Sequence, residues 1–307
     1  MQIVAITEVP TTRQSGDSSL RTGGTIRQTL LTDSTVDGLN FRFVRSQYQG
    51  GDAAFESPRH HHAFQQVRFT EAGSVNYAPG HDIPQGDIAY FPRGTYYGPQ
   101  RKDHGTGLLL QLGFHGEHQS GQHWTQHRAT ALNRLIARGR IDGGIYYERN
   151  EATGQEMARD ANQALYEEQY FAQTGQKFSI PCEGYAEPIL MHPAAFEYYP
   201  AADGVRIKQL GHFFDHPGPN ADIRIGIVEL TDLASYVFAP DRAQIAWTLD
   251  AGLRVGATTY GKLTCLYSPR EEALKVSADT TAADHKAIEM YVLELPRLDN
   301  LESLARR

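Results

Sequence analysis

The stretch FESPRHHHAFQQVRFTEAGSVNYAPG (residues 55–80) decides the interpretation of this sequence. It contains three consecutive histidines followed by a run that mixes apolar and glutamine residues. Successive side chains of a strand point to opposite faces, so His60 and His62 share one face and His61 points the other way. Gln66, four residues beyond His62, returns to the face of His60 and His62 if the strand continues. The stretch therefore predicts a cluster of polar side chains on one face of a strand.

Short strand-like segments surround this stretch. Examples are LNFRFVRSQ (residues 39–47), GDIAYFP (residues 86–92) and GLLLQLGF (residues 107–114). The chain also has 29 glycines and 15 prolines, which supply many turns. Strands this short, separated by turn residues at this spacing, predict an antiparallel sandwich or barrel.

The second half of the chain repeats features of the first. VRFTEAGSVNY (residues 67–77) matches AWTLDAGLRVGATTYG (residues 246–261) around a turn made of an acidic residue, alanine and glycine. Between the halves, Ala129, Leu132, Leu135 and Ile136 follow helical spacing, and Gly175 is a plausible C-cap of a second helix. We therefore predict an internal duplication with a helical segment between two β-rich units.

The histidines belong to the first of two gapped motifs. His60 and His62 are followed by three residues, then Gln66, then six residues, then Gly73. The second motif begins at Gly86 and continues through five residues to Pro92-Arg93-Gly94, then through two residues to Tyr97.

In order and spacing, these motifs resemble those of the cupin superfamily, whose members are double-stranded β-helix or jelly-roll barrels. Cupins usually have glutamate where Gln66 stands and histidine where Tyr97 stands. With the duplication, the resemblance implies an all-β bicupin of two jelly-roll barrels with a helical connector. The expected domains are an N-terminal cupin barrel (residues 1–121), the connector (residues 122–175) and a degenerate C-terminal cupin barrel (residues 176–307).

The resemblance also implies a metal site. In cupins, two histidines, a carboxylate and a distant third histidine hold a first-row transition metal. Here His60 and His62 would hold a divalent metal (Fe, Mn, Ni, Cu or Zn), with Gln66 and Tyr97 as further ligands or as catalytic polar groups. Amide and phenol groups are weaker ligands than carboxylate and imidazole, because a phenol binds a metal well only when ionised.

The function that the resemblance implies is a metal-dependent bicupin enzyme for a small aromatic or enolic substrate, with a dioxygenase as the first hypothesis. The substrate would chelate the metal, and oxygen or a base would attack the activated carbon. A cupin isomerase, cyclase or lyase is the chemical alternative. A metal-free, non-catalytic barrel that binds a small molecule is the second alternative, and histidines without any function are the third.

Several other residues are weaker candidates for the site. His104 or His115 could complete the metal site, and one of Tyr96 and Tyr97 should face the interior of the barrel. Gln111 is a polar residue among leucines on its strand. Three aromatic residues could form a pocket wall, although each is more simply explained as core: Phe41, Phe43 and Phe69.

The second barrel lacks the histidine motif. Its positions equivalent to His60, His62 and Gln66 fall near Ala239, Asp241 and Ile245, so we expect no metal there.

The charge and the ends of the chain exclude some classes of protein. A formal net charge of −7 over 307 residues and the lack of a basic stripe argue against nucleic-acid binding. No apolar run has the length of a membrane-spanning helix, and MQIVAITEVP does not resemble a secretory signal. The two cysteines, Cys182 and Cys265, lie far apart in the sequence. We therefore expect a cytoplasmic protein with a small-molecule substrate, no membrane partner and a homodimeric assembly.

Overall fold

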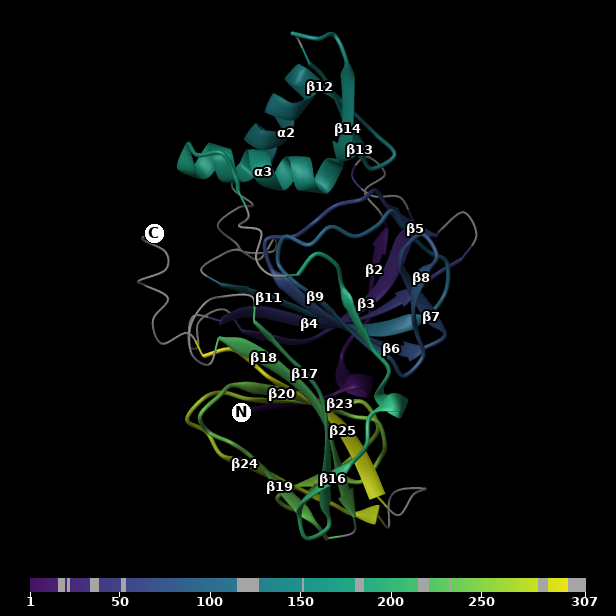
Figure 1. The fold of residues 1–307 in the computed structure, drawn as a ribbon, viewed down its shortest axis with the longest axis vertical. Helices are drawn as coiled ribbons and strands as arrows, with labels where there is room; N and C mark the ends of the chain where they lie inside the picture. The colour runs from purple at the N-terminus through teal and green to yellow at the C-terminus, as the bar shows by residue number, and fades with distance from the viewer. Residues whose placement is uncertain are drawn as a thin grey trace. The chain divides into compact units, whose positions relative to one another are not determined.

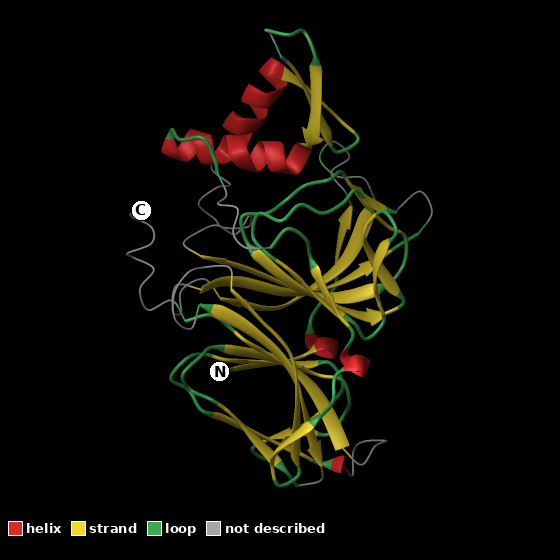
Figure 2. Ribbon diagram, in the orientation of Figure 1, coloured by secondary structure: helices red, strands yellow, loops and turns green. Residues whose placement is uncertain are grey.

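The computed structural model describes residues 1–15, 20, 23–33, 39–50, 54–114, 127–150, 152–179, 185–214, 221–231, 233–280 and 287–297. Strands dominate these residues (Figure 2), so the predicted all-β class is confirmed. The chain forms two compact units. One comprises Thr11–Gln28 and Leu39–Leu190, and the other comprises Met1–Pro10, Thr29–Gly38 and Met191–Arg307.

The N-terminal barrel is built on a seven-stranded sheet (Figure 1). Across this sheet lie, in order, β15 (Ile189–Met191), β9 (Ile88–Phe91), β6 (Gln65–Ala72), β11 (Thr106–Phe114), β4 (Leu39–Tyr48), β3 (Gly24–Asp33) and β2 (Thr12–Ser15). Two small sheets accompany it: β5 (Phe55–Ser57) with β10 (Gln100–Lys102), and β7 (Ser74–Ala78) with β8 (His81–Pro84).

The C-terminal barrel has a seven-stranded sheet of its own. Its order is β1 (Gln2–Ala5), β23 (Thr264–Ser268), β20 (Gln244–Thr248), β25 (Ala287–Glu294), β18 (Asp222–Thr231), β17 (Val205–Phe214) and β16 (Tyr199–Ala202). A four-stranded sheet has the order β19 (Ser235–Phe238), β24 (Leu274–Ala278), β21 (Leu253–Val255) and β22 (Thr258–Tyr260). Two short 3-10 helices, η1 (Ile6–Glu8) and η4 (Pro193–Ala195), complete the described elements of this unit.

The two large sheets have the same topology, which confirms the predicted duplication. Strands β9, β6, β11, β4, β3 and β2 correspond in order to β23, β20, β25, β18, β17 and β16. In each sheet the edge strand beside β9 or β23 comes from a distant part of the chain. β1 pairs with β23, so the first strand of the chain lies in the C-terminal sheet. The domain boundaries at residues 121 and 175 stay a prediction, since the observed units are not continuous in sequence.

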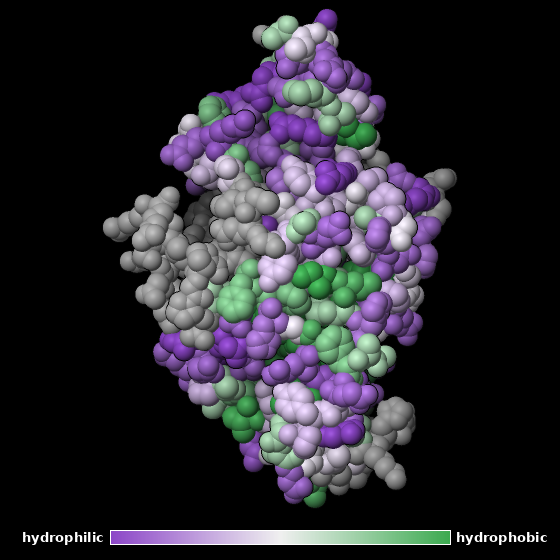
Figure 3. Space-filling model, in the orientation of Figure 1, coloured by the Kyte–Doolittle hydropathy of each residue, from purple (hydrophilic) through white to green (hydrophobic). Residues whose placement is uncertain are grey.

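The segment between the repeats holds helices α2 (Arg128–Arg138) and α3 (Ala161–Thr174). α3 ends at Gly175, whose φ of 69° and N–H bond to the Phe171 carbonyl form the predicted C-cap. Figure 3 shows a mostly hydrophilic face over this segment, where Arg138 and Glu168 form an ion pair at 2.6 Å. No helix of the described residues is both long and apolar enough to span a membrane.

A three-stranded sheet in this segment was not predicted. β12 (Gly139–Asp142), β13 (Ile145–Arg149) and β14 (Glu156–Asp160) form an antiparallel meander between the helices. The predicted helical connector (residues 122–175) is therefore only partly helical, because it also contains this sheet. The Gly143-Gly144 pair, with φ of 56° and 82°, supplies the tight turn between β12 and β13. Asp160 then starts α3, because its side chain accepts a hydrogen bond from the Gln163 N–H at 2.8 Å.

The interiors of the two barrels differ. The C-terminal barrel holds a continuous apolar cluster of Val205, Val228, Leu230, Phe238, Ala246, Leu253, Leu266, Leu274, Val276, Ala278, Ile288, Met290 and Val292. The N-terminal barrel has a smaller apolar cluster of Tyr77, Ile83, Ala89, Phe91 and Tyr97. Strand pairing places Gln66 opposite Phe91 and Arg68 opposite Ala89, on the face that contributes to this cluster. Polar side chains therefore enter the interior of the N-terminal barrel.

One turn of the N-terminal barrel has a strict steric requirement. Gly105 has a φ of +98°, and a Cβ atom there would lie 2.4 Å from the Ser74 carbonyl oxygen. Gly80 also has a positive φ, +73°, but a Cβ there would meet nothing within 4 Å. We predict that Gly80→Ala lowers the free energy of unfolding by about 1 kcal/mol, from backbone strain alone. Gly105→Ala should cost at least roughly 2 kcal/mol more.

Denaturant unfolding of the two glycine variants checks this prediction. The Gly80 variant controls for the conformational penalty, so the difference between the variants isolates the steric clash at Gly105. Equal losses in the two variants would contradict it.

Candidate functional site

The histidines of the first motif lie beside Tyr97. His60 and Tyr97 form a β-bridge in which each backbone N–H donates to the other's carbonyl at 3.0 Å. The ring centroid of His60 lies 4.6 Å from that of Tyr97 and 5.0 Å from that of His62. His61 points elsewhere, since its ring stacks on Tyr96 at 4.3 Å and its Nδ1 lies 3.2 Å from the Gly94 carbonyl. Burial lowers the pKa of His61. The structure therefore separates His61 from the other two histidines, as alternation predicts.

The strand does not continue from His60 to Gln66. Residues 63 and 64 form a bend, and β6 begins only at Gln65. Gln66 nevertheless reaches the same region, because its Nε2 donates to the Tyr97 hydroxyl at 3.0 Å. All four residues predicted for the site, His60, His62, Gln66 and Tyr97, are thus brought together by ring contacts and this hydrogen bond.

His60 is held in one orientation by two oxygen atoms. Its Nδ1 lies 2.7 Å from the Pro58 carbonyl, which can only accept a hydrogen bond, so Nδ1 carries the hydrogen. The neutral ring then has its lone pair on Nε2. Oδ2 of Asp160, the N-cap residue of α3, lies 3.7 Å from the same Nδ1. Both side chains are buried, with 5% of His60 and none of Asp160 exposed. Sequence reasoning missed Asp160, although an aspartate before Ala-Asn-Gln is a plausible N-cap signal.

Arg68 is the second residue that sequence reasoning missed. Its Nε and Nη2 donate to Gln66 Oε1 at 3.1 and 2.8 Å, and Nη2 also donates to the Tyr97 hydroxyl at 2.8 Å. The guanidinium lies over the rings of Phe91 and Tyr97, with Cζ 4.1 and 4.6 Å from their centroids. Arg68 is only 8% exposed. Its Nη1 is buried and has no hydrogen-bond acceptor in the described part of the chain. The sequence signal for Arg68 was its position two residues after Gln66, which puts both side chains on the same face of a strand.

These contacts bear on the metal site that the resemblance implies. Gln66 Oε1 already accepts two hydrogen bonds from Arg68, and the Tyr97 oxygen accepts one from Arg68 and one from Gln66. A guanidinium is always protonated, so it holds a fixed positive charge beside both oxygens that a metal dication would need. The described residues also contain no group of three or more His, Cys, Asp or Glu side chains arranged to hold a metal ion. The four residues therefore do not fit a four-ligand metal centre.

A buried lysine, Lys102, lies within electrostatic range of both Arg68 and Arg27. Lys102 is 5% exposed, and its Nζ lies 3.3 Å from the Tyr48 hydroxyl and 4.7 Å from that ring's centroid. Burial, together with the positive charges of Arg68 and Arg27, holds the pKa of Lys102 well below its ordinary value. Arg27 is half-buried and contributes a buried Nε. A lysine is usually solvated, so nothing in the sequence marked Lys102 as a residue of the interior.

The weaker candidates fall in different places. His104 is exposed and bonds Asp103 at 2.6 Å, and His115 lies outside the described residues. Tyr96 is 42% exposed, whereas Tyr97 is buried. Gln111 pairs with Gln66 across β11 and β6, so it shares the interior face. Phe41, Phe43 and Phe69 are buried and pair with leucines of β11, on the face of the sheet opposite Gln66. They form core, as the sequence favoured for each of them, and not a pocket wall.

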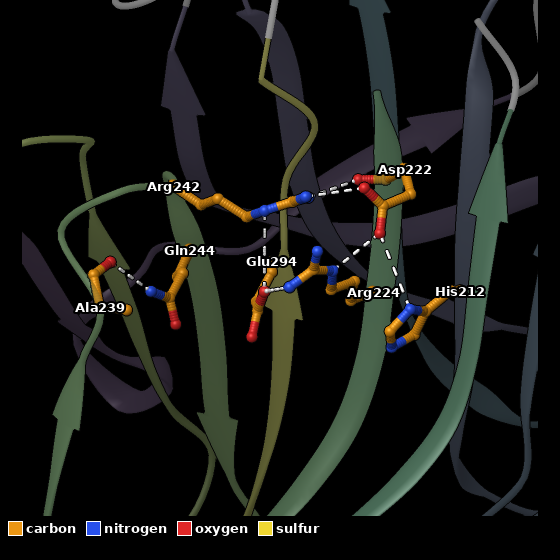
Figure 4. A network of polar contacts seen from close by, with 7 residues as sticks. All are labelled: His212, Asp222, Arg224, Ala239, Arg242, Gln244 and Glu294. Carbon is orange, nitrogen blue, oxygen red and sulfur yellow. Dashed lines mark hydrogen bonds and ion pairs between the residues drawn. The ribbon is translucent and has the colours of Figure 1, made fainter. Parts of the chain in front are cut away.

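In the C-terminal barrel, arginines form ion pairs with carboxylates (Figure 4). Arg242 donates to Asp222 Oδ1 at 2.7 Å, and Arg224 donates to Asp222 Oδ2 at 2.7 Å and to Glu294 at 3.2 Å. His212 Nδ1 lies 3.8 Å from Asp222. Burial acts to raise the pKa of Asp222, but the two arginines outweigh it, and the pKa lies below its ordinary value. Each arginine of this network therefore has a carboxylate partner.

Strand pairing relates this network to the N-terminal site. Gln244 pairs with Glu294 across β20 and β25, as Gln66 pairs with Gln111 across β6 and β11. The equivalent of Gln66 is therefore Gln244, one residue before the Ile245 expected from the sequence. The sequence alignment was shifted because it matched Gly73 with Gly252, although Gly252 lies eight positions after Gln244 and Gly73 only seven after Gln66.

Comparisons with known proteins place this fold. No family model matches the chain, and no curated protein matches it in sequence. Among solved structures, the chain is similar to a "putative dioxygenase" from Nostoc punctiforme, with 11% identity and a TM-score of 0.52 over 97% of this chain and 84% of that one.

Two oxalate decarboxylases are similar to the same degree. The enzyme of Lactobacillus farciminis, in a formate complex, has 13% identity and a TM-score of 0.53 over 100% of this chain and 90% of that one. The enzyme of Bacillus subtilis has 13% identity and a TM-score of 0.51 over 96% and 76% of the two chains. At these identities the likeness establishes the fold, which in these proteins is the bicupin fold. The chain thus has the two-barrel fold that its two gapped motifs predicted.

Proposed function

We propose that the chain is an enzyme that acts on a small organic molecule in the N-terminal barrel. The observation that carries this proposal is the buried cluster of His60, Gln66, Arg68 and Tyr97, held by hydrogen bonds of 2.7–3.1 Å. The C-terminal barrel, by contrast, holds a large apolar cluster, and the arginines of its polar network are paired with carboxylates. The structures that resemble the chain support the proposal, since their names describe a dioxygenase and oxalate decarboxylases, all of which use small molecules.

His60 is the proton-transfer group in this proposal. With Nδ1–H directed at the Pro58 carbonyl, the Nε2 lone pair of His60 can accept a proton from a substrate. The Asp160 carboxylate, 3.7 Å from Nδ1, stabilises the imidazolium that results. Arg68 and Tyr97 orient the substrate by hydrogen bonding and charge. These roles suit an isomerase, a cyclase or a lyase, which need no external oxidant.

A metal-dependent dioxygenase for an aromatic or enolic substrate is the second candidate. The name of the Nostoc protein favours it, and one Bacillus subtilis structure is described by its Mn(II) centres. A first-row metal would activate oxygen or polarise the substrate. His60 and His62 are the residues that would hold it, although Gln66 and Tyr97 do not fit as further ligands. The homodimer and the cytoplasmic location expected from the sequence stay predictions.

A substrate panel separates the two candidates. The protein, purified without a histidine tag, is incubated with oxalate, dihydroxybenzoates and 1,3-diketones, with and without added Mn(II) or Fe(II). Oxygen uptake and product masses are recorded. Product without oxygen uptake or added metal supports proton-transfer chemistry, and uptake that requires metal supports the dioxygenase. Turnover that survives His60→Ala would contradict both, and a panel without any turnover would favour the non-catalytic binding protein.

Asp160 offers a specific test of the role of His60. We predict that Asp160→Asn lowers kcat/KM roughly 10- to 100-fold, because it removes the charge that stabilises protonated His60. Asparagine caps helices as well as aspartate does, so α3 should keep its N-cap and the melting temperature should change little. Asp142→Asn is the matched control, since the Asp142 side chain is 78% exposed. Equal activity of the two variants would show that Asp160 does not act on His60.

A further inference from the structure

The interior charges of the two barrels are not balanced in the same way. In the C-terminal network, Arg224 and Arg242 face the carboxylates of Asp222 and Glu294. In the N-terminal barrel, the groups that receive the hydrogen bonds of Arg68 are a neutral amide and a neutral phenol. Lys102 likewise bonds only the Tyr48 hydroxyl and aromatic faces within the described chain. Among the described residues, the hydrogen bonds of Arg68 and Lys102 thus reach neutral groups and no carboxylate.

We propose that Arg68 takes the place of the metal as the cation of the N-terminal barrel, and that the ligand it receives, together with Lys102, is a small organic anion. This inference rests on the proposed function, because it names the class of molecule that the same site accepts. The ligand carries a carboxylate, whose oxygen atoms can accept charge-assisted hydrogen bonds from the Nη1 group of Arg68.

The geometry of Arg68 supports a role as a fixed anion receptor. Three hydrogen bonds to Gln66 and Tyr97 and the rings of Phe91 and Tyr97 hold the guanidinium plane. Its Nη1 is buried and has no acceptor among the described residues, so one donor group remains for a ligand. A buried donor without an acceptor costs free energy, and a bound carboxylate would remove that cost. The two departures from the cupin motifs, glutamine and tyrosine, are the groups that accept the hydrogen bonds of Arg68.

Lys102 supports the same inference by a different observation. Its side chain is buried against Tyr48 and Phe55, from β4 and β5, within electrostatic range of Arg68 and Arg27. Burial of the Lys102 side chain lowers its pKa well below the ordinary value, and the positive charges of Arg68 and Arg27 lower it further. An anion bound in the barrel would attract Lys102 and favour its protonated form.

The metal content of the protein tests the first half of the proposal. Protein purified without a histidine tag is incubated with Mn(II) or Zn(II), desalted and analysed for first-row metals. We expect less than about 0.1 metal per chain, with no difference between wild type and the His60→Ala/His62→Ala variant. About one metal per chain in wild type, lost in the variant, would overturn the proposal.

Anion binding tests the second half. Acetate and benzoate, with acetamide and benzamide as uncharged counterparts, are titrated at constant ionic strength and followed by ligand-observed NMR. We expect the carboxylates to bind better than the amides. Arg68→Met should weaken carboxylate binding roughly 10- to 100-fold, and Arg68→Lys should recover only part of the loss. Arg101→Met is the matched control, because Arg101 is exposed on the opposite face of the strand that carries Lys102.

The outcomes distinguish this inference from the proposed function. Carboxylates that bind no better than their amides, or that bind equally well to wild type and Arg68→Met, overturn the anion class even if turnover is found. Carboxylate binding that depends on Arg68, in a protein without turnover, supports the inference and contradicts the enzymatic role. Circular dichroism of each variant confirms that it is folded before binding is compared.

The burial of Lys102 gives a prediction about stability, and its role in anion binding gives a second prediction for the same variant. Since the folded protein lowers the pKa of Lys102, the unfolded chain binds more protons, and stability rises with pH from the folded pKa up to the unfolded pKa of about 10.4. Lys102→Met should therefore stabilise the ligand-free protein more at about pH 6 than at about pH 10. The same variant should weaken benzoate binding. Urea unfolding at the two pH values measures the first effect, and a uniform loss of stability would contradict it.

Discussion

The hydrogen bonds from Arg68 to Gln66 and Tyr97 are the interaction on which the N-terminal site depends. They link β6 to the second motif and fix the orientation of an amide, a phenol and two aromatic rings. They also set the sign of the charge at the centre of the barrel. A metal dication and a guanidinium are both cations, but a carboxylate and an imidazole bind the metal better than an amide and a phenol do, whereas a guanidinium donates hydrogen bonds to neutral oxygen atoms as well. Gln66 and Tyr97 therefore suit the same site, because each has a neutral oxygen atom that accepts a hydrogen bond from Arg68.

The sequence predicted much of the fold because the signals for it are local and periodic. Strand alternation and the spacing of glycine, proline and histidine identified the barrel, and the turn at residues 71–73 identified its repeat. The three-stranded sheet β12–β14 was missed, since its GlyGly turn lies between segments whose composition also suits a helix. Asp160 shows how a capping residue decides where a helix begins. Its side chain caps the N-terminus of α3, so the residues before it lie outside the helix, although the predicted helical connector included them.

The site was harder to predict, for a physical reason. The spacing of the two motifs can be read from the sequence alone, and it identified four residues that the structure brings together: His60, His62, Gln66 and Tyr97. Arg68, Lys102 and Asp160 come from three elements, and only folding brings them to one place. Their importance depends on burial, which is unusual for charged residues and which no local pattern signals. The duplication adds a comparison within one molecule: equivalent strands carry a neutralised network in one barrel and an unbalanced one in the other.

The exchange of edge strands has a consequence for how the protein folds as it is synthesised. β1 leaves the ribosome before its partner β23, which follows more than half the length of the 307-residue sequence later. β9 likewise waits for β15, which follows the helical segment. Neither large sheet can therefore be completed from its own continuous stretch of sequence. A chain cut between the repeats would leave an unpaired sheet edge on each fragment, and such edges are sites of aggregation. The two barrels repeat one architecture, but both halves of the chain must be synthesised before either large sheet has all its strands. Each half carries the edge strand of the other half's sheet.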